Sequence, residues 1–146
     1  KLENMILEKE LNIEAEFDEE EILVRADPDA IERVLINLLH NAIKFTPPKG
    51  LITVSTEKQK DRVLISVKDT GIGIDPADLE LIWERFYKTD RSRSRDKSGT
   101  GLGLSIVRNI ILEHKSEIKV ESEPGKGTKF SFYLPAATSR NIETQS

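Results

Sequence analysis

The sequence predicts an α+β fold in which a single sheet is covered on one face by helices. Segments with the two-residue alternation of strands occur in pairs towards both ends of the chain. Two longer segments, residues 27–45 and 102–114, instead repeat apolar side chains at helical spacing. The length of 146 residues suits one domain with a buried core.

Composition excludes several classes of function. Charged residues make up 33% of the chain, the net charge is −4, and no uninterrupted basic block points to nucleic acid or an anionic membrane as a partner. The absence of cysteine excludes disulfides, zinc–thiolate sites and a thiol nucleophile. Neither His40 nor His114 has a metal-ligand spacing around it. No apolar run approaches the roughly 20 residues of a membrane span, and because the chain starts at Lys1 we expect it to be part of a longer protein.

The first elements are short. Residues 1–10 carry a thin apolar stripe among charges, which predicts a helix. Residues 11–17 alternate apolar and polar side chains and predict a half-buried strand, and residues 22–24 predict a second, shorter strand.

The helix predicted for residues 27–45 opens with Asp27 as its N-cap and Pro28 at its first position, and two prolines end it. Its apolar stripe consists of Ile31, Leu35, Leu38 and Ala42, and its polar stripe of Arg33, Asn37, Asn41 and Lys44. The polar stripe could present oxygens to a metal and positive charge to phosphates, or it could simply face solvent. Because asparagine is a poor helix former, two of them in mid-helix need a reason.

Residues 51–57 and 62–69 predict two strands around a charged turn. Since side chains alternate along a strand, Asp69 continues the core-facing apolar row of the second strand. A carboxylate there is costly unless hydrogen-bond donors meet it. An adenine amino group is a suitable donor, and the alternative is an aspartate that caps the following turn. Gly71 and Gly73 come next and allow the backbone to approach a ligand closely.

The C-terminal half is mixed in type. Asp75-Pro76 predicts the start of a short helix that ends near Trp83, and residues 89–99, which lack a large apolar side chain, predict a mobile loop. The remaining predicted elements are a helix at residues 102–114, strands at residues 118–122 and 128–134, and a polar tail at residues 136–146.

A glycine-rich segment, Gly-Thr-Gly-Leu-Gly-Leu at residues 99–104, opens the predicted helix at 102–114. Glycines before a helix N-terminus present N–H groups and a positive dipole end to phosphate. The segment is not a Rossmann fingerprint, because Leu104 stands where the third glycine would be. Residues 125–128 are not a P-loop, because no Ser or Thr directly follows Lys126, and they predict a hairpin turn.

Together these segments resemble the ATP-binding catalytic domain of sensor histidine kinases, in the GHKL superfamily. Residues 37–45 (NLLHNAIKF) resemble the N box of that family, residues 69–74 (DTGIGI) its first glycine box, residues 86–88 (FYK) its F box and residues 99–104 its second glycine box. All four occur in the family's order and approximate spacing. The resemblance covers about residues 11–134. It implies a two-layer α/β sandwich over residues 1–135, with a mixed, mostly antiparallel sheet backed by about three helices.

The resemblance also implies a site for ATP and Mg²⁺. Asn41, with Asn37 beside it, would hold the metal against the triphosphate, and Lys44 would contact phosphate. Asp69 would bind the adenine amino group, assisted through a water by the hydroxyl of Thr128. The residues implied in catalysis are Asn37, Asn41, Lys44 and Arg93. Those implied in binding the cofactor are Asn41, Lys44, Phe45, Asp69, Gly71, Gly73, Ile74, Phe86, Gly99, Thr100, Gly101, Leu102, Gly103, Leu104 and Thr128.

Residues 89–98 would form the ATP lid of the family, in which arginines such as Arg93 could reach the γ-phosphate. The chain departs from the family pattern at three places. Phe45 stands where relatives often have tyrosine, so a hydroxyl contact is missing. Ser98 replaces a common glycine of the lid hinge, and Lys115-Ser116 replaces glycines of a later turn.

The implied function is transfer of the γ-phosphate to a histidine on a separate dimerisation domain of the same parent chain, for onward transfer to a response regulator receiver domain. Gyrase-type ATPases place a glutamate base where Asn37 stands, and an amide cannot take up that proton, which favours transfer over hydrolysis. We expect a monomeric piece of a homodimeric parent, the cytoplasmic portion of a membrane-anchored sensor kinase, which itself contacts neither nucleic acid nor membrane.

Three alternatives stay open at this stage. The first is a GHKL kinase that phosphorylates serine, as anti-sigma factors do, although the F box and the long lid favour a histidine kinase. The second is a nucleotide-sensing module without catalysis. The third is a purely structural α/β domain.

Overall fold

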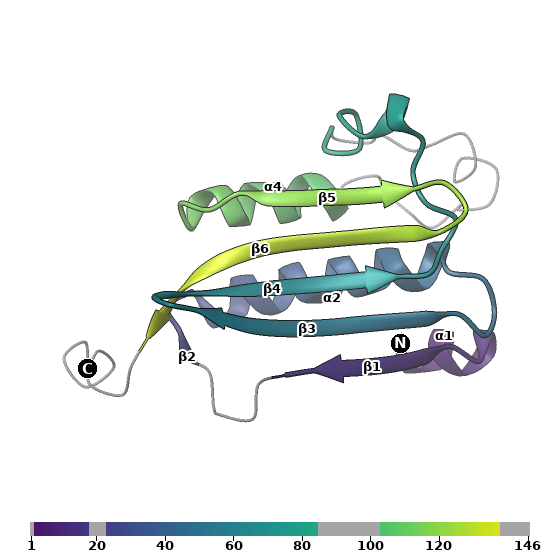
Figure 1. Cartoon of the computed structure of the whole chain (residues 1–146), viewed down its shortest axis with the longest axis horizontal. Helices are drawn as coiled ribbons and strands as arrows, with labels where there is room; N and C mark the ends of the chain where they lie inside the picture. The colour runs from purple at the N-terminus through teal and green to yellow at the C-terminus, as the bar shows by residue number, and fades with distance from the viewer. Residues whose placement is uncertain (1, 18–22, 85–102, 138–146) are drawn as a thin grey trace.

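The computed structural model describes residues 2–17, 23–84 and 103–137 (Figure 1). The helical elements in these ranges are α1 (Leu2–Lys9), α2 (Pro28–Phe45), the 3₁₀ turn η1 (Pro76–Asp78) and α4 (Gly103–Glu113). The strands are β1 (Asn12–Glu16), β2 (Leu23–Val24), β3 (Leu51–Gln59), β4 (Arg62–Asp69), β5 (Ile118–Glu123) and β6 (Gly127–Ala137).

The strands form one mixed sheet with the order β1-β3-β4-β6-β2, and β5 also pairs with β6. Only the pairing of β1 with β3 is parallel among the described strands, and the other pairings are antiparallel. Figure 1 shows α1, α2 and α4 on the same face of this sheet. The predicted two-layer sandwich, with a mostly antiparallel sheet backed by three helices, is confirmed.

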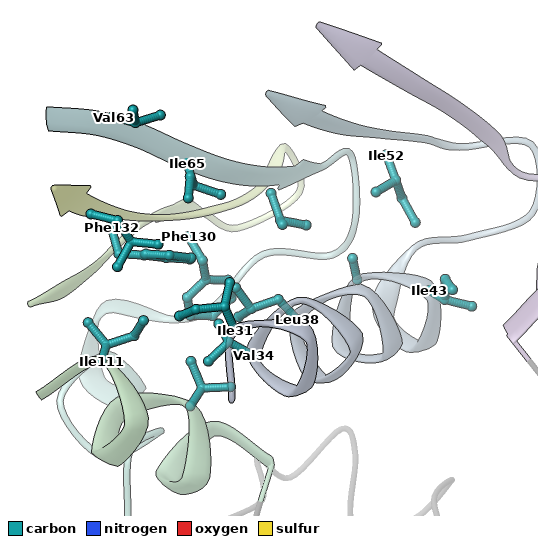
Figure 2. Close-up of a cluster of buried hydrophobic side chains, with 14 of the residues drawn as sticks. Ile31, Val34, Leu38, Ile43, Ile52, Val63, Ile65, Ile111, Phe130 and Phe132 are labelled. Atoms are coloured by element: carbon teal, nitrogen blue, oxygen red, sulfur yellow. The ribbon is translucent and has the colours of Figure 1, made fainter. Parts of the chain in front are cut away.

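The core lies between the sheet and the two longer helices, α2 and α4. Figure 2 shows Phe130 and Phe132 of β6 directed towards α2 and α4, where Val34 and Leu38 of α2 meet them. Their partners include Val63, Ile65 and Val67 of β4 and Val107 and Ile111 of α4. Since α2 and β4 both contribute buried rows, the apolar packing fixes their relative position. Of the predicted site residues, Asn37, Asn41, Lys44 and Phe45 lie on α2, and Asp69 ends β4.

The start of α2 is built as predicted. The Asp27 carboxylate accepts hydrogen bonds from the N–H groups of Asp29 and Ala30, at 3.1 and 3.3 Å, and Pro28 occupies the first turn. Such a cap is worth about 1 kcal/mol. Of the predicted apolar stripe, Ile31, Leu38 and Ala42 are buried, while Leu35 is partly buried against the core.

The first strand differs from its prediction. All five residues of β1 are exposed, and Ile13 retains 43% of its surface, whereas a half-buried strand was predicted. Of the described strands β1 pairs with β3 alone, so it forms an edge of the sheet, and Leu11 just before it is the buried residue of this segment. An alternating pattern gives the two faces of a strand, but it does not tell whether a helix covers one of them.

Two further boundaries differ. Asp75 makes no side-chain capping bond, and η1 is a single 3₁₀ turn instead of a helix ending at Trp83. β6 continues beyond its predicted end, so that Ala136 and Ala137, predicted to start the polar tail, pair with β2. None of the helices in the described ranges is long and apolar enough to cross a membrane.

Candidate functional site

The C-terminal end of β4 carries a buried carboxylate. Asp69 is only 5% exposed, and its Oδ1 accepts hydrogen bonds from the N–H groups of Gly71 (2.8 Å) and Thr128 (3.2 Å). Burial raises the pKa of the Asp69 carboxyl above its ordinary value, while these two N–H groups act in the opposite direction. Within the described residues both of these bonds go to one oxygen, so the carboxylate is fixed in orientation and Oδ2 is available to a further donor.

Thr128 contacts this carboxylate through its backbone. Asp69 and Thr128 are direct partners across β4 and β6, which brings the backbone N–H of Thr128 to the carboxylate. The Thr128 hydroxyl instead lies 2.8 Å from the hydroxyl of Ser122. Cross-strand register decides this contact, and register between strands about sixty residues apart could not be inferred from the sequence pattern.

Ser122 is a residue that sequence reasoning missed. Its hydroxyl accepts from the N–H of Ile74 at 2.8 Å and donates to the carbonyl of Gly127 at 3.0 Å. The glycine turn after β4 is thereby tied to the β5–β6 hairpin. The signal available in the sequence, a serine on a strand, was too common to single it out.

The glycine turn fits tightly between α2 and this hairpin. A Cβ on Gly71 would lie 2.6 Å from the Phe45 carbonyl oxygen and 2.8 Å from Asp69 Oδ1, so only glycine fits there. Gly73 has a φ of 76°, and its added Cβ would overlap the carbonyl of Glu123. The N–H of Ile72 donates to the Phe45 carbonyl at 3.2 Å, which joins the turn to the end of α2.

The polar stripe of α2 extends to the end of the helix that contacts the glycine turn. Asn37, Asn41 and Lys44 are all half-buried, and the Lys44 ammonium lies 5.1 Å from the centroid of the Phe45 ring. Asn37 and Asn41 are one turn apart on one side of the helix. Among the described residues, no group of three or more His, Asp or Glu side chains could hold a metal ion. Two amide oxygens fit an ion such as Mg²⁺ that takes its other ligands from phosphate and water.

This geometry can be compared with known proteins. Residues 26–138 match the model of the family described as histidine kinase-, DNA gyrase B- and HSP90-like ATPase. The chain belongs to this family.

Its relatives place the domain among the catalytic domains of sensor histidine kinases. Sensor protein SrrB of Staphylococcus aureus is 45% identical over 109 residues, which cover 75% of this chain and 19% of SrrB. The catalytic domain of histidine kinase ThkA, in a nucleotide-free structure, is 36% identical with a TM-score of 0.78, over 92% of this chain and 86% of that one. The ATPase domain described here therefore spans about a fifth of the length of SrrB.

Two larger structures share the fold. Full-length ShkA in complex with AMPPNP is 31% identical with a TM-score of 0.80, over 93% of this chain and 28% of that one. Histidine kinase ThkA in complex with response regulator protein TrrA is 33% identical with a TM-score of 0.75, over 93% of this chain and 37% of that one.

Part of the predicted site of this histidine kinase-type domain lies outside the described residues. These residues are Phe86, Arg93, Gly99, Thr100, Gly101 and Leu102, together with the rest of the predicted lid. Gly103 and Leu104 form the first turn of α4, and Leu104 packs against the core. Ile74 also packs against the core. The described part of the site therefore consists of the α2 face, Asp69, the glycine turn, Thr128 of β6 and the first turn of α4.

The two histidines have different settings. His40 is half-buried on α2 immediately before Asn41. The His114 ring lies beyond the end of α4, where Nε2 accepts from the N–H of Asp27 at 3.1 Å and Nδ1 lies 2.8 Å from the Ile110 carbonyl. Because an amide N–H can only donate and a carbonyl can only accept, Nδ1 must carry the proton. His114 thus uses both ring nitrogens to join the end of α4 to the start of α2.

Proposed function

We propose that the domain binds Mg-ATP and donates its γ-phosphate to a histidine on a separate dimerisation domain of the same parent protein, from which it passes to a response regulator receiver domain. The observation that carries the proposal is Asp69, a buried carboxylate with one oxygen held by two backbone N–H groups and the other available. A buried carboxylate is costly unless its oxygens meet hydrogen-bond donors, and the amino group of adenine would donate to Oδ2.

The glycine turn supports the adenine end of the proposed site. Gly71 and Gly73 keep side chains away from the base, and the ring of Phe45 lies at the end of the helix that this turn contacts. Thr128 contributes through its backbone, and Ile74 contributes an apolar wall held in place by Ser122. Adenine recognition thus rests on backbone geometry around a single oriented carboxylate.

The phosphate end follows from the face of α2. Asn41 and Asn37 would hold Mg²⁺ by their amide oxygens, and Lys44 would contact phosphate. The ion would neutralise negative charge on the triphosphate while the γ-phosphoryl group is transferred to the acceptor histidine. Arg93, in the lid, would add positive charge at the γ-phosphate, and the glycines at residues 99–103 would offer N–H groups to the phosphates.

Transfer is favoured over hydrolysis by the chemistry of Asn37. Within the same family, gyrase-type ATPases use a glutamate at the corresponding place as base for the attacking water. An amide cannot accept that proton, so water gains no activation from this side chain. The phosphoryl group is then kept for an outside nucleophile that is brought into line.

The relatives support the proposed partners. SrrB is a sensor protein, and ThkA has been crystallised with the response regulator TrrA. For this domain we propose the corresponding arrangement, a monomeric catalytic unit within a homodimeric and membrane-anchored parent whose kinase portion lies in the cytoplasm. Two measurements test the proposal together: calorimetric binding of AMPPNP with Mg²⁺, and transfer of labelled phosphate to a purified histidine-bearing domain. Binding without transfer would favour a nucleotide sensor.

Asn41→Ala is expected to weaken Mg-AMPPNP binding at least about tenfold, because a ligand to a charged centre is lost. Binding measured with EDTA should change much less, since adenine contacts remain. Calorimetry with and without Mg²⁺ checks this. The matched control is Asn109→Ala, an exposed asparagine on α4. An equal loss with and without the ion would show that Asn41 is not a metal ligand.

A further inference from the structure

The side-chain ammonium of Lys9 caps the C-terminal end of α2, the helix that carries the proposed metal and phosphate ligands. Lys9, the last residue of α1, donates to the carbonyls of Ile43 (2.8 Å), Lys44 (3.0 Å) and Thr46 (3.1 Å). Its side chain is half-buried. Three carbonyl acceptors match the three donors of an ammonium group. Lys9 therefore caps the C-terminal end of α2 from 34 or more positions earlier in the chain.

This cap completes the bonding of the last turn of α2. The last four carbonyls of a helix lack partners within the helix. In α2 these belong to residues 42–45. The Ala42 carbonyl receives the Thr46 hydroxyl at 2.6 Å, and the Phe45 carbonyl receives the N–H of Ile72 at 3.2 Å. The carbonyls of Ile43 and Lys44, which lie between them, accept hydrogen bonds from Lys9. The last turn of α2 therefore contacts both α1 and the glycine turn.

Backbone bonds fasten the end of α1 to the loop that follows α2. The N–H of Lys49 donates to the Lys9 carbonyl at 2.9 Å, and the N–H of Asn12 donates to the Gly50 carbonyl at 2.9 Å. None of the residues of α1 is fully buried, but Leu2, Met5 and Ile6 are partly buried and pack against the core. The junction around Lys9 adds hydrogen bonds to these apolar contacts and fixes the end of α1.

The electrostatics of the junction bear on an anionic ligand. The C-terminal end of a helix carries roughly half a negative charge, which repels phosphate. Lys9 places a positive charge directly on these carbonyls. It therefore offsets the repulsion on the turn that bears Lys44 and Phe45.

We propose that Lys9 is a positioning residue of the nucleotide site, which couples the placement of α1 to nucleotide affinity. The inference rests on the proposed function. It adds a residue outside all four family motifs and assigns it a role through Lys44 and Phe45, not through contact with the ligand. Coupling is reciprocal, so bound nucleotide holds α1 in place as strongly as α1 supports binding.

The first test is substitution with a long uncharged side chain. Lys9→Met is expected to lower Mg-AMPPNP affinity at least about fivefold, the lower range of coupling between sites. Lys9→Arg, which keeps the charge and donors, should recover part of that loss. Lys119→Met, an exposed lysine on β5, is the matched control and should bind as the unchanged chain does. Calorimetry is done below the melting temperature that circular dichroism gives for each variant.

The second test needs no variant. Bound AMPPNP should slow hydrogen exchange at the amides of Glu10 and Leu11, which bond to the carbonyls of Leu7 and Ile6 at the end of α1. A Lys9→Met affinity within twofold of the unchanged chain, an equal loss with Arg, or unchanged exchange at these two amides would each overturn the inference. Absence of AMPPNP binding to the unchanged chain would instead contradict the proposed function itself.

Discussion

Asp69→Asn is expected to weaken nucleotide binding about tenfold to a hundredfold, the value of a hydrogen bond to a charged group. The amide oxygen can still accept from Gly71 and Thr128 in place of Oδ1. The other position then carries an NH₂ group, which faces the adenine amino group with donors on both sides. Recognition is therefore lost, while the internal bonds of the site are kept.

The same substitution is expected to leave the free energy of unfolding of the nucleotide-free domain unchanged or raised. Burial raises the pKa of the Asp69 carboxyl, which means that its ionised form is destabilised in the folded state. Removing the charge relieves that cost. Calorimetry with ADP and chemical denaturation without ligand check the two halves, with Asp61→Asn as an exposed control. Unchanged ADP affinity would eliminate Asp69 as the adenine anchor.

Acidification is expected to weaken nucleotide binding at a higher pH than an ordinary aspartate would allow. The folded domain keeps a proton on Asp69 at pH values where the unfolded chain has released it, because burial raises this pKa. Folding stability from this group is thus present at low pH and lost as the pH rises through the raised pKa. Nucleotide affinity changes in the opposite direction and rises with pH through this pKa, because the ionised carboxylate is the acceptor for the adenine amino group. ADP titrations across pH check this, and Asp69→Asn corrects for protonation of the nucleotide.

The sequence predicted the fold and the position of Asp69 because both depend on local periodicity. Alternation along β4 placed Asp69 on the core face, and the structure confirms that it is buried and met by donors. The sequence did not predict the backbone N–H of Thr128 as one of those donors, since cross-strand register is a tertiary property. The water-mediated role of the Thr128 hydroxyl stays a prediction.

Contacts between distant segments set the limit of prediction. Nothing in the sequence distinguished Lys9 from other lysines of this charged chain, and only the packing of α1 against the end of α2 gives its ammonium three carbonyls. The exposure of Ile13 was missed for the same reason, because strand order determines which strand lies at an edge. Local motifs thus identified the candidate ligand-binding residues, and the supporting residues became visible only in the fold.

The isolated domain is expected not to phosphorylate itself, although it should phosphorylate a cognate histidine domain supplied separately. His114 lies beyond the C-terminal end of α4, an 11-residue helix, so it is roughly 16 Å along the axis from the glycines that would hold phosphate. Both of its ring nitrogens are already engaged, with Asp27 and Ile110. A nucleophile needs a free nitrogen lone pair in line with the γ-phosphate, and His114 has neither the position nor the lone pair.

His40 is excluded by a different argument. It is half-buried on α2 directly before Asn41, so its ring would have to swing into line with the γ-phosphate while the helix stays packed through Leu38 and Ala42. Incubation with γ-labelled ATP, followed by acid treatment, measures any histidine phosphate on the chain. Acid-labile label that disappears in His40→Gln or His114→Gln would overturn the expectation. Label that appears only on an added histidine domain is the expected result, at a rate reduced because the tether between the two domains is missing.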